Sequence, residues 1–167
     1  MKTLIFFALL SMPGMLMTSI ANADDGYRSQ VEAIINGKEA PEGIVFEIVD
    51  RDMDYLDTAI PEIKQMAEQL RKRFPGLDIA IVSHGFEQFG LTRSQLDAND
   101  SLKSSVQSLV SSDVPIHVCG TFADWQGVDQ SAFSELVDVS PAGPAQINDY
   151  ISLGYTRIIV AGEVEFE

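Results

Sequence analysis

The chain is poor in the residues that build metal centres and disulfides. Its 167 residues include one cysteine, Cys119, and two histidines, His84 and His117. A single cysteine cannot form a disulfide within the chain. These residues also lack the Cys-x-x-Cys or His-x-x-x-His spacing of a zinc site, and the acidic residues are scattered. We therefore expect neither an internal disulfide nor a dedicated metal site.

Glycine-rich phosphate loops are missing as well. The first expected strand ends in Asp50-Arg51-Asp52, where a dinucleotide-binding protein would continue with Gly-x-Gly-x-x-Gly. The sequence contains no Walker loop and no Gly-x-Ser-x-Gly elbow of an α/β-hydrolase. These absences exclude the common nucleotide-dependent and serine-hydrolase classes, and we expect no cofactor.

Basic residues are scarce. Eleven Lys and Arg stand against 25 Asp and Glu, which gives a formal net charge of −14. A surface of this sign repels the phosphates of nucleic acids and the headgroups of anionic lipids. Nucleic acid and membrane surfaces are therefore not expected partners.

The first 23 residues have the pattern of a signal peptide. Lys2 is followed by an uncharged, mainly apolar run from Thr3 to Ile20, and Ala21-Asn22-Ala23 has the Ala-x-Ala form that signal peptidase cuts. The run is near the lower length limit of a membrane span and is broken by Pro13-Gly14, which favours a cleaved signal over a retained anchor. We expect a periplasmic or secreted chain that begins at Asp24 and has no membrane attachment.

The part of the chain after the signal has the length of one domain. Removal of 23 of the 167 residues leaves 144. Residues 24–42 are polar with a short helical pattern, and we interpret them as an N-terminal extension packed on a domain formed by 43–167. In that domain, short apolar segments alternate with segments of helical periodicity, which predicts an α/β fold with a parallel sheet covered on both faces. The strands are expected at 43–50, 77–85, 116–118, 136–140 and 156–160.

Two chemically capable side chains stand where expected strands end. His84 closes the second strand, and Cys119 closes the third, just before Gly120 and a helix start. Ligands and chemistry gather at the carboxyl ends of parallel strands, and backbone N–H groups at a helix start favour a thiolate. His117 lies two residues before the cysteine and faces the same side of the strand, although it is more simply interpreted as a half-buried structural histidine.

The sequence around these positions resembles the DsrE/DsrF-like family of sulfur-relay proteins. The resemblance extends roughly from Gly43 to Val160 and rests on four short stretches that occur in the family's order and at its spacing. They are Ile81–Gly85, Val114–Thr121, Gly127–Asp129, and Val139–Gly143 together with Gly154-Tyr155.

This resemblance implies a three-layer α/β/α sandwich with a five-stranded, mostly parallel sheet, assembled as a homo-oligomer such as a trimer or hexamer. It also implies a sulfur carrier or sulfurtransferase that takes sulfane sulfur from a donor protein as a persulfide on Cys119 and passes it to an acceptor. Two features depart from the family. Many single-cysteine members carry Asn after Cys-Gly, where this chain has Thr121, and the best studied carriers are cytoplasmic.

Six residues make up the expected site. The sulfur of Cys119 would accept hydrogen bonds from the backbone N–H groups of the residues that follow it, and His84 would exchange a proton with it. The candidate catalytic residues are Cys119 and His84, and the candidate substrate-binding residues are Gly85, Gly120, Thr121 and Phe122.

Two alternatives remain open. Free cysteine is among the most buried residue types, so Cys119 also fits a structural role in a non-catalytic, oligomeric module that binds a small ligand or a protein. A redox-sensing thiol that forms a mixed disulfide with a partner is the other alternative. Exposure separates them, because an exposed sulfur fits the carrier or the sensor and a buried sulfur favours the binding module.

The signal-peptide assignment gives a first prediction. Protein purified from its native host should have the mass of a chain that begins at Asp24, because cleavage follows Ala23. Intact-mass spectrometry of the purified protein is the measurement. A full-length chain retained in the membrane fraction would contradict the assignment.

Overall fold

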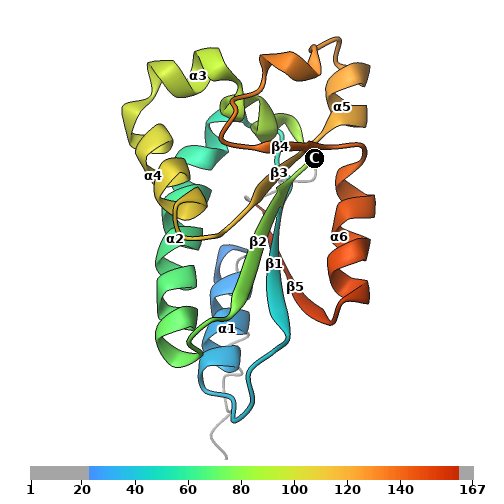
Figure 1. Ribbon diagram of the computed structural model, residues 1–167. Coiled ribbons are helices and arrows are strands. Elements are labelled where there is room, and N and C mark those ends of the chain that lie inside the picture. The colour runs from blue at the N-terminus through green and yellow to red at the C-terminus, as the bar shows by residue number, and fades with distance from the viewer. Residues whose placement is uncertain (1–22, 162–167) are drawn as a thin grey trace, which may run out of the picture.

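The architecture is a five-stranded sheet in which all strands run parallel (Figure 1). The computed structural model describes residues 23–161, and the expected signal peptide lies outside the described residues except for Ala23. The strand order is β4-β3-β2-β1-β5. The prediction of a five-stranded, mostly parallel sheet is confirmed. The strands are β1 (Gly43–Ile48), β2 (Asp78–Ser83), β3 (Ile116–Cys119), β4 (Asp138–Ser140) and β5 (Tyr155–Val160).

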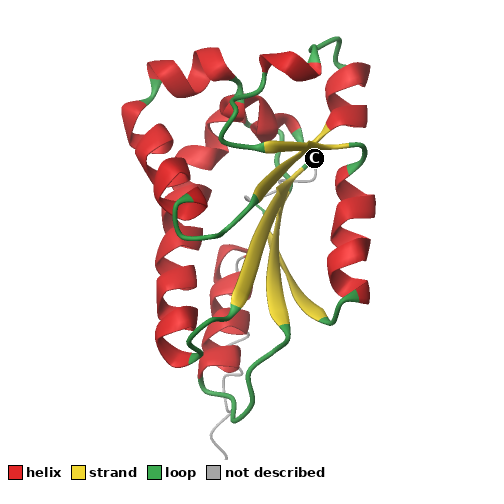
Figure 2. Cartoon of the chain, viewed as in Figure 1, coloured by secondary structure: helices red, strands yellow, loops and turns green. Residues whose placement is uncertain are grey.

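Helices connect the strands almost throughout (Figure 2). The segment after β2, which the sequence leaves undecided between helix and loop, forms a 3₁₀ helix at Phe86–Leu91 and then a short α-helix. Two further 3₁₀ turns lie at Met53–Tyr55 and Gln130–Ala132. The α-helices are α1 (Ala23–Ile35), α2 (Leu56–Arg73), α3 (Arg93–Ala98), α4 (Asp100–Val110), α5 (Gly120–Trp125) and α6 (Gly143–Ser152).

The two faces of the sheet are covered unequally. Helices α1, α2 and α4 pack on one face around a large apolar core, whereas α6 lies alone on the other face (Figure 1). The smaller core under α6 contains Val45, Ala80, Val82 and Ile147. The fold is thus a three-layer α/β/α arrangement.

Strand β1 is buried along its whole length because it lies between β2 and β5. Side chains alternate between the two faces of a strand. Ile44, Phe46 and Ile48 therefore enter the large core, while Val45 and Glu47 face the side of α6. A carboxylate thus lies in the middle of the sheet, with 5% of Glu47 exposed.

Helix α1 forms within the segment expected as an N-terminal extension. Tyr27 and Val31 are each about 2% exposed and belong to the large core, and the helix packs on α2 and β5. This helix therefore contributes side chains to the same core as the strands.

The first residue of α6 is a point of close approach to the sheet. A Cβ atom added to Gly143 would lie 2.6 Å from Cβ of His84 and 3.3 Å from Cβ of Cys119. Real Cβ atoms rarely approach that closely, so glycine allows the helix to start directly on the ends of β2 and β3.

Gly143→Ala should therefore lower the free energy of unfolding by about 1–3 kcal/mol, because the added methyl group displaces α6 from the strand ends. Gly26→Ala in α1 is the matched control, since nothing lies within 4 Å of its added Cβ. That change should instead stabilise the helix by about 0.5–1 kcal/mol. Urea denaturation measures both, and equal effects would contradict this account of α6.

Candidate functional site

The register of β2 and β3 brings the two expected catalytic residues together. Val82 pairs with His117 and Ser83 with Val118, so the next positions, His84 and Cys119, lie beside each other at the carboxyl edge of the sheet. Both contact the start of α6, because Gly143 approaches the Cβ atoms of both residues. Both residues stand at the carboxyl ends of strands, as the sequence predicts, and the structure adds that these strands are neighbours.

The thiol of Cys119 is covered. The residue is 4% exposed, and its Sγ accepts a hydrogen bond from the N–H of Phe122 at 3.4 Å. The fully buried side chain of Gln88 holds its backbone: the Cys119 N–H donates to Oε1 at 2.7 Å, and Nε2 donates to the Cys119 carbonyl at 3.3 Å. The thiol is therefore buried, whereas a carrier or a sensor would present an exposed thiol. This burial favours the binding-module alternative.

The backbone after Cys119 contributes less to the sulfur than expected. Among residues 23–161, the N–H of Phe122 is the one backbone donor that hydrogen-bonds to Sγ. The N–H and hydroxyl of Thr121 both donate to the carbonyl of Pro141, at 3.0 Å and 2.6 Å. This corrects the expectation that Thr121 offers its N–H to the sulfur. Gly120 is buried, and an added Cβ there would lie 2.9 Å from Nε2 of Gln130, so its role is close packing.

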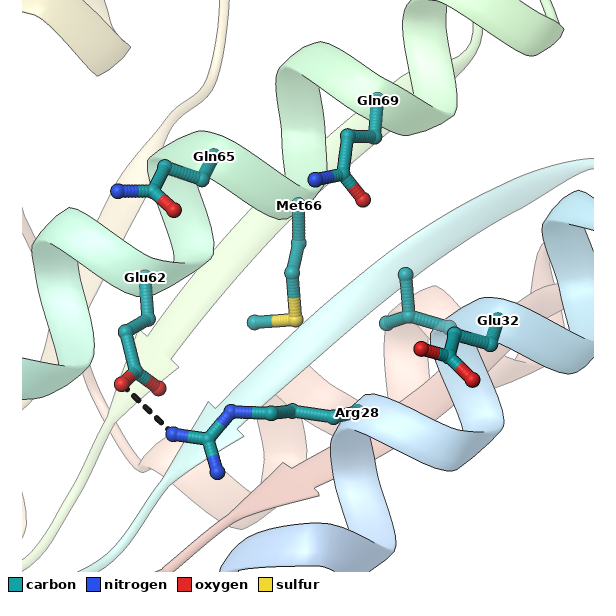
Figure 3. A pocket seen from close by; sticks show the side chains of 7 residues that line it. Arg28, Glu32, Glu62, Gln65, Met66 and Gln69 are labelled. Atoms are coloured by element: carbon teal, nitrogen blue, oxygen red, sulfur yellow. Dashed lines mark hydrogen bonds and ion pairs between the residues drawn. The ribbon is translucent and has the colours of Figure 1, made fainter.

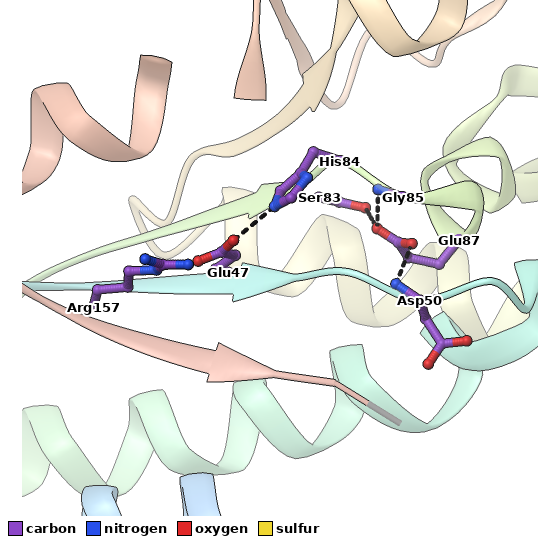
Figure 4. Close-up of polar contacts among 7 residues, drawn as sticks. All are labelled: Glu47, Asp50, Ser83, His84, Gly85, Glu87 and Arg157. Carbon is purple, nitrogen blue, oxygen red and sulfur yellow. Dashed lines mark hydrogen bonds and ion pairs between the residues drawn. The ribbon is translucent and has the colours of Figure 1, made fainter. Parts of the chain in front are cut away.

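Glu47 is a site residue that sequence reasoning missed. Its Oε1 pairs with Nε2 of His84 at 2.8 Å, and its Oε2 accepts a hydrogen bond from Nε of Arg157 (Figure 4). The three residues come from adjacent strands and face the α6 side, as diagonal neighbours on a parallel sheet do. A glutamate in the middle of the apolar run Gly43–Ile48 was the signal, because a charge in a buried strand needs partners.

The pairing keeps Glu47 ionised. Burial raises the pKa of its carboxyl group, but the hydrogen bonds from His84 and Arg157 and their positive charge outweigh burial, so the pKa lies below its usual value. An ionised carboxylate can only accept hydrogen bonds, so Nε2 of His84 must carry the proton that it shares with Glu47. In the neutral form of the ring, the other nitrogen, Nδ1, is then unprotonated. Nδ1 has no hydrogen-bond partner within residues 23–161. In the neutral form of the ring, this nitrogen can accept a proton.

A second buried carboxylate ties two strand ends together. Oε1 of Glu87 accepts hydrogen bonds from Oγ of Ser83 at 2.7 Å and from the N–H of Gly85 at 2.9 Å, and Oε2 accepts from the N–H of Asp50 at 2.7 Å (Figure 4). Burial raises the pKa of Glu87, and these hydrogen bonds only partly oppose that rise. A Cβ on Gly85 would lie 2.2 Å from Oε2, so glycine is required for this contact.

A hollow of about 610 Å³ opens beside these residues. It lies at the carboxyl edge of the sheet, where parallel α/β sheets bind ligands, beside the residues that directly follow β1, β2 and β5. Three expected site residues, His84, Gly85 and Phe122, line it, and Cys119 does not. Among the described residues, the lining consists of Val49, Asp50, Arg51, His84, Gly85, Phe86, Phe122 and Ala161.

His117 takes no part in this hollow. Its Nε2 pairs with the hydroxyl of Tyr150 at 2.8 Å, and its Nδ1 lies 3.4 Å from Oγ of Ser140. Burial lowers the pKa of His117, and the charge of Asp138 opposes this only in part. The residue is thus a half-buried structural histidine that fastens α6 to the sheet.

A smaller hollow of about 210 Å³ lies between α1 and α2, away from the carboxyl edge (Figure 3). Its cation, Arg28, pairs with Glu62 at 2.7 Å.

Within residues 23–161, no cluster of three or more His, Cys, Asp or Glu is placed to hold a metal ion. No helix in this part of the chain is long and apolar enough to cross a membrane.

Solved structures share this architecture. A protein of unknown function, MTH1491 from Methanobacterium thermoautotrophicum, superposes with a TM-score of 0.57 at 20% identity, over 70% of this chain and 97% of its own. The ychN protein from E. coli does so with a TM-score of 0.52 at 13% identity, over 72% and 99%. The chain has the DsrE-like fold. No protein-family profile and no curated protein matches the sequence. At such identities the likeness shows the fold and not the activity.

Glu47→Gln tests the pairing of Glu47 with His84 and Arg157. At neutral pH it should lower the free energy of unfolding by about 1–3 kcal/mol, because charge-assisted hydrogen bonds to His84 and Arg157 are lost. The pKa of Glu47 is lower in the folded state than in the unfolded state. Ionised Glu47 therefore stabilises the fold at any pH above the ordinary glutamate pKa, about 4.3. This contribution is lost as the pH falls through the pKa that Glu47 has in the folded state.

The wild type should therefore lose more stability than Glu47→Gln when urea denaturation is repeated from neutral pH down to about pH 3. Glu68→Gln, which changes an exposed carboxylate on α2, should leave the acid profile of the wild type unchanged. Parallel profiles for the wild type and Glu47→Gln would show that the buried carboxylate is not held ionised.

Proposed function

We propose that the protein is a sulfur carrier that accepts sulfane sulfur as a persulfide on Cys119. The observation that carries the proposal is the meeting of Cys119 and His84 at the carboxyl edge, both packed against Gly143. A thiol beside an imidazole is a common arrangement for an activated sulfur nucleophile. The DsrE-like fold and the resemblance of the cysteine stretch to sulfur-relay proteins are consistent with it.

The transfer needs only the thiol and a proton acceptor. The thiolate of Cys119 attacks the outer sulfur of a donor persulfide, a new S–S bond forms at Sγ, and the donor's S–S bond breaks to release a thiolate. Nδ1 of His84 takes the thiol proton and returns it to the released thiolate. Glu47 keeps the imidazole in the tautomer that this task requires, because its carboxylate accepts the hydrogen bond of Nε2.

The donor has one defined direction of approach in this proposal. The N–H of Phe122 donates a hydrogen bond to Sγ of Cys119, and Phe122 also lines the hollow at the carboxyl edge. A donor in the hollow therefore reaches the sulfur past Phe122, whose side chain must shift because the thiol is covered. We further infer that the carrier acts after export, in the periplasm or outside the cell, as a homo-oligomer with protein donors or acceptors.

A second candidate function is a non-catalytic binding module. The 4% exposure of Cys119 and its absence from the lining of the hollow favour it. In that case the hollow binds a small ligand or protein segment, and Cys119 fills space beneath it. Stability separates the two functions, because a structural thiol contributes to packing and a carrier thiol must open to its donor.

Incubation of the mature protein with inorganic polysulfide tests the carrier function. The wild type should gain the mass of one sulfur atom, a reductant should reverse the gain, and Cys119→Ser should not gain it. His84→Asn should slow loading by about 10²-fold or more, because the proton acceptor is lost. Circular dichroism and urea denaturation check that both variants are folded.

The opposite result has a clear form. The wild type would gain no sulfur, and Cys119→Ser would lose several kcal/mol of stability, roughly what an unpaired polar group costs in an apolar site. Cys119 would then be a core residue, and the binding-module function would replace the carrier function.

A further inference from the structure

The hollow beside Cys119 is much larger than sulfur transfer alone requires. Its volume is about 610 Å³, whereas a water-sized molecule fills about 30 Å³ of liquid. Pockets that hold drug-sized organic molecules have volumes of about 300–1,000 Å³. The space at the carboxyl edge therefore fits an organic molecule better than a short chain of sulfur atoms.

The walls of the hollow are mainly apolar. Val49, Phe86, Phe122 and Ala161 line it, and Phe86 is 43% exposed. The ring of Phe86 meets the ring of Phe122 edge to face, with 5.6 Å between the ring centres. An aromatic or alkyl group in the hollow would cover this exposed ring and remove apolar surface from water.

Of the polar side chains that line the hollow, the cation Arg51 is not engaged by any described residue. Oδ1 of Asp50 accepts a hydrogen bond from the N–H of Asp52 at 2.7 Å, and Nε2 of His84 pairs with Glu47. Arg51 makes no hydrogen bond or ion pair with any residue of the described part of the chain. A guanidinium group binds a carboxylate through two parallel hydrogen bonds, so Arg51 offers a site for an anionic end of a ligand.

We infer that this hollow selects the sulfur donor, and that the donor is a small organic persulfide with an apolar body and a carboxylate. The inference rests on the proposed carrier function and narrows its substrate class. The apolar body packs on Phe86, the carboxylate pairs with Arg51, and the persulfide passes Phe122 to reach Cys119. Sulfur transfer conserves atoms: the Cys119 thiol and the organic persulfide give the Cys119 persulfide and the organic thiol.

The test compares three donors by the rate at which Cys119 gains one sulfur atom. They are the persulfide of para-(mercaptomethyl)benzoate, the persulfide of mercaptoethanol, which lacks an apolar body and a carboxylate, and inorganic polysulfide. The aromatic donor should react with a kcat/KM at least roughly tenfold higher than that of the mercaptoethanol donor, because only its ring is held in the hollow.

Three variants locate this preference. Phe86→Ala should reduce the rate with the aromatic donor roughly tenfold and Arg51→Gln about fivefold, and each should reduce the rate with mercaptoethanol persulfide by a clearly smaller factor. Trp125→Ala is the matched control, because it removes an aromatic ring that is 76% exposed on α5 and does not line the hollow. Thermal denaturation confirms that each variant is folded.

Binding of an inert analogue provides a readout without sulfur transfer. The S-methyl ether of para-(mercaptomethyl)benzoate should bind the wild type in a calorimetric titration and bind Phe86→Ala roughly tenfold more weakly. Equal rates for all three donors, or equal effects of Phe86→Ala and Trp125→Ala, would overturn the donor assignment while the carrier function stands. Failure of every donor to load Cys119 would overturn the carrier function and the donor assignment with it.

Discussion

The carboxyl edge of the sheet depends on the pairing of one buried charge. Glu47 lies near the carboxyl end of β1, on the face that α6 covers only in part, and it needs partners to remain ionised there. Its partners, His84 and Arg157, come from the two flanking strands. The same interaction therefore links β2, β1 and β5 and holds the ring of His84 close to Gly143, at the strand end next to that of Cys119.

Most of the fold could be predicted from the sequence, because its strands are short apolar runs and its long helices have clear periodicity. The segment Phe86–Leu91 could not be assigned, since its residues follow neither pattern. Glu87 and Gln88 in it are polar yet fully buried. They serve as hydrogen-bond partners for the backbone at the strand ends, a role that depends on tertiary contacts and leaves no local signature.

The site was predictable only in part. His84 and Cys119 were found because both stand at strand ends, and adjacency followed from the register of β2 and β3. The covering of Cys119 could not be predicted, because it results from α5 and from the start of α6 packing over the thiol. Glu47 was missed because no single-sequence pattern says which charge in a strand has partners, although its place in an apolar run was a usable signal.

A crystal structure of the protein after polysulfide treatment tests the central claim most directly. Diffraction collected for sulfur anomalous signal would locate every sulfur atom at the carboxyl edge. The carrier account predicts one additional peak about 2.05 Å from Sγ of Cys119, on the side of the hollow and within reach of His84. An unmodified Cys119 that is still covered, and whose sulfur still accepts the hydrogen bond from the N–H of Phe122, would contradict the carrier account.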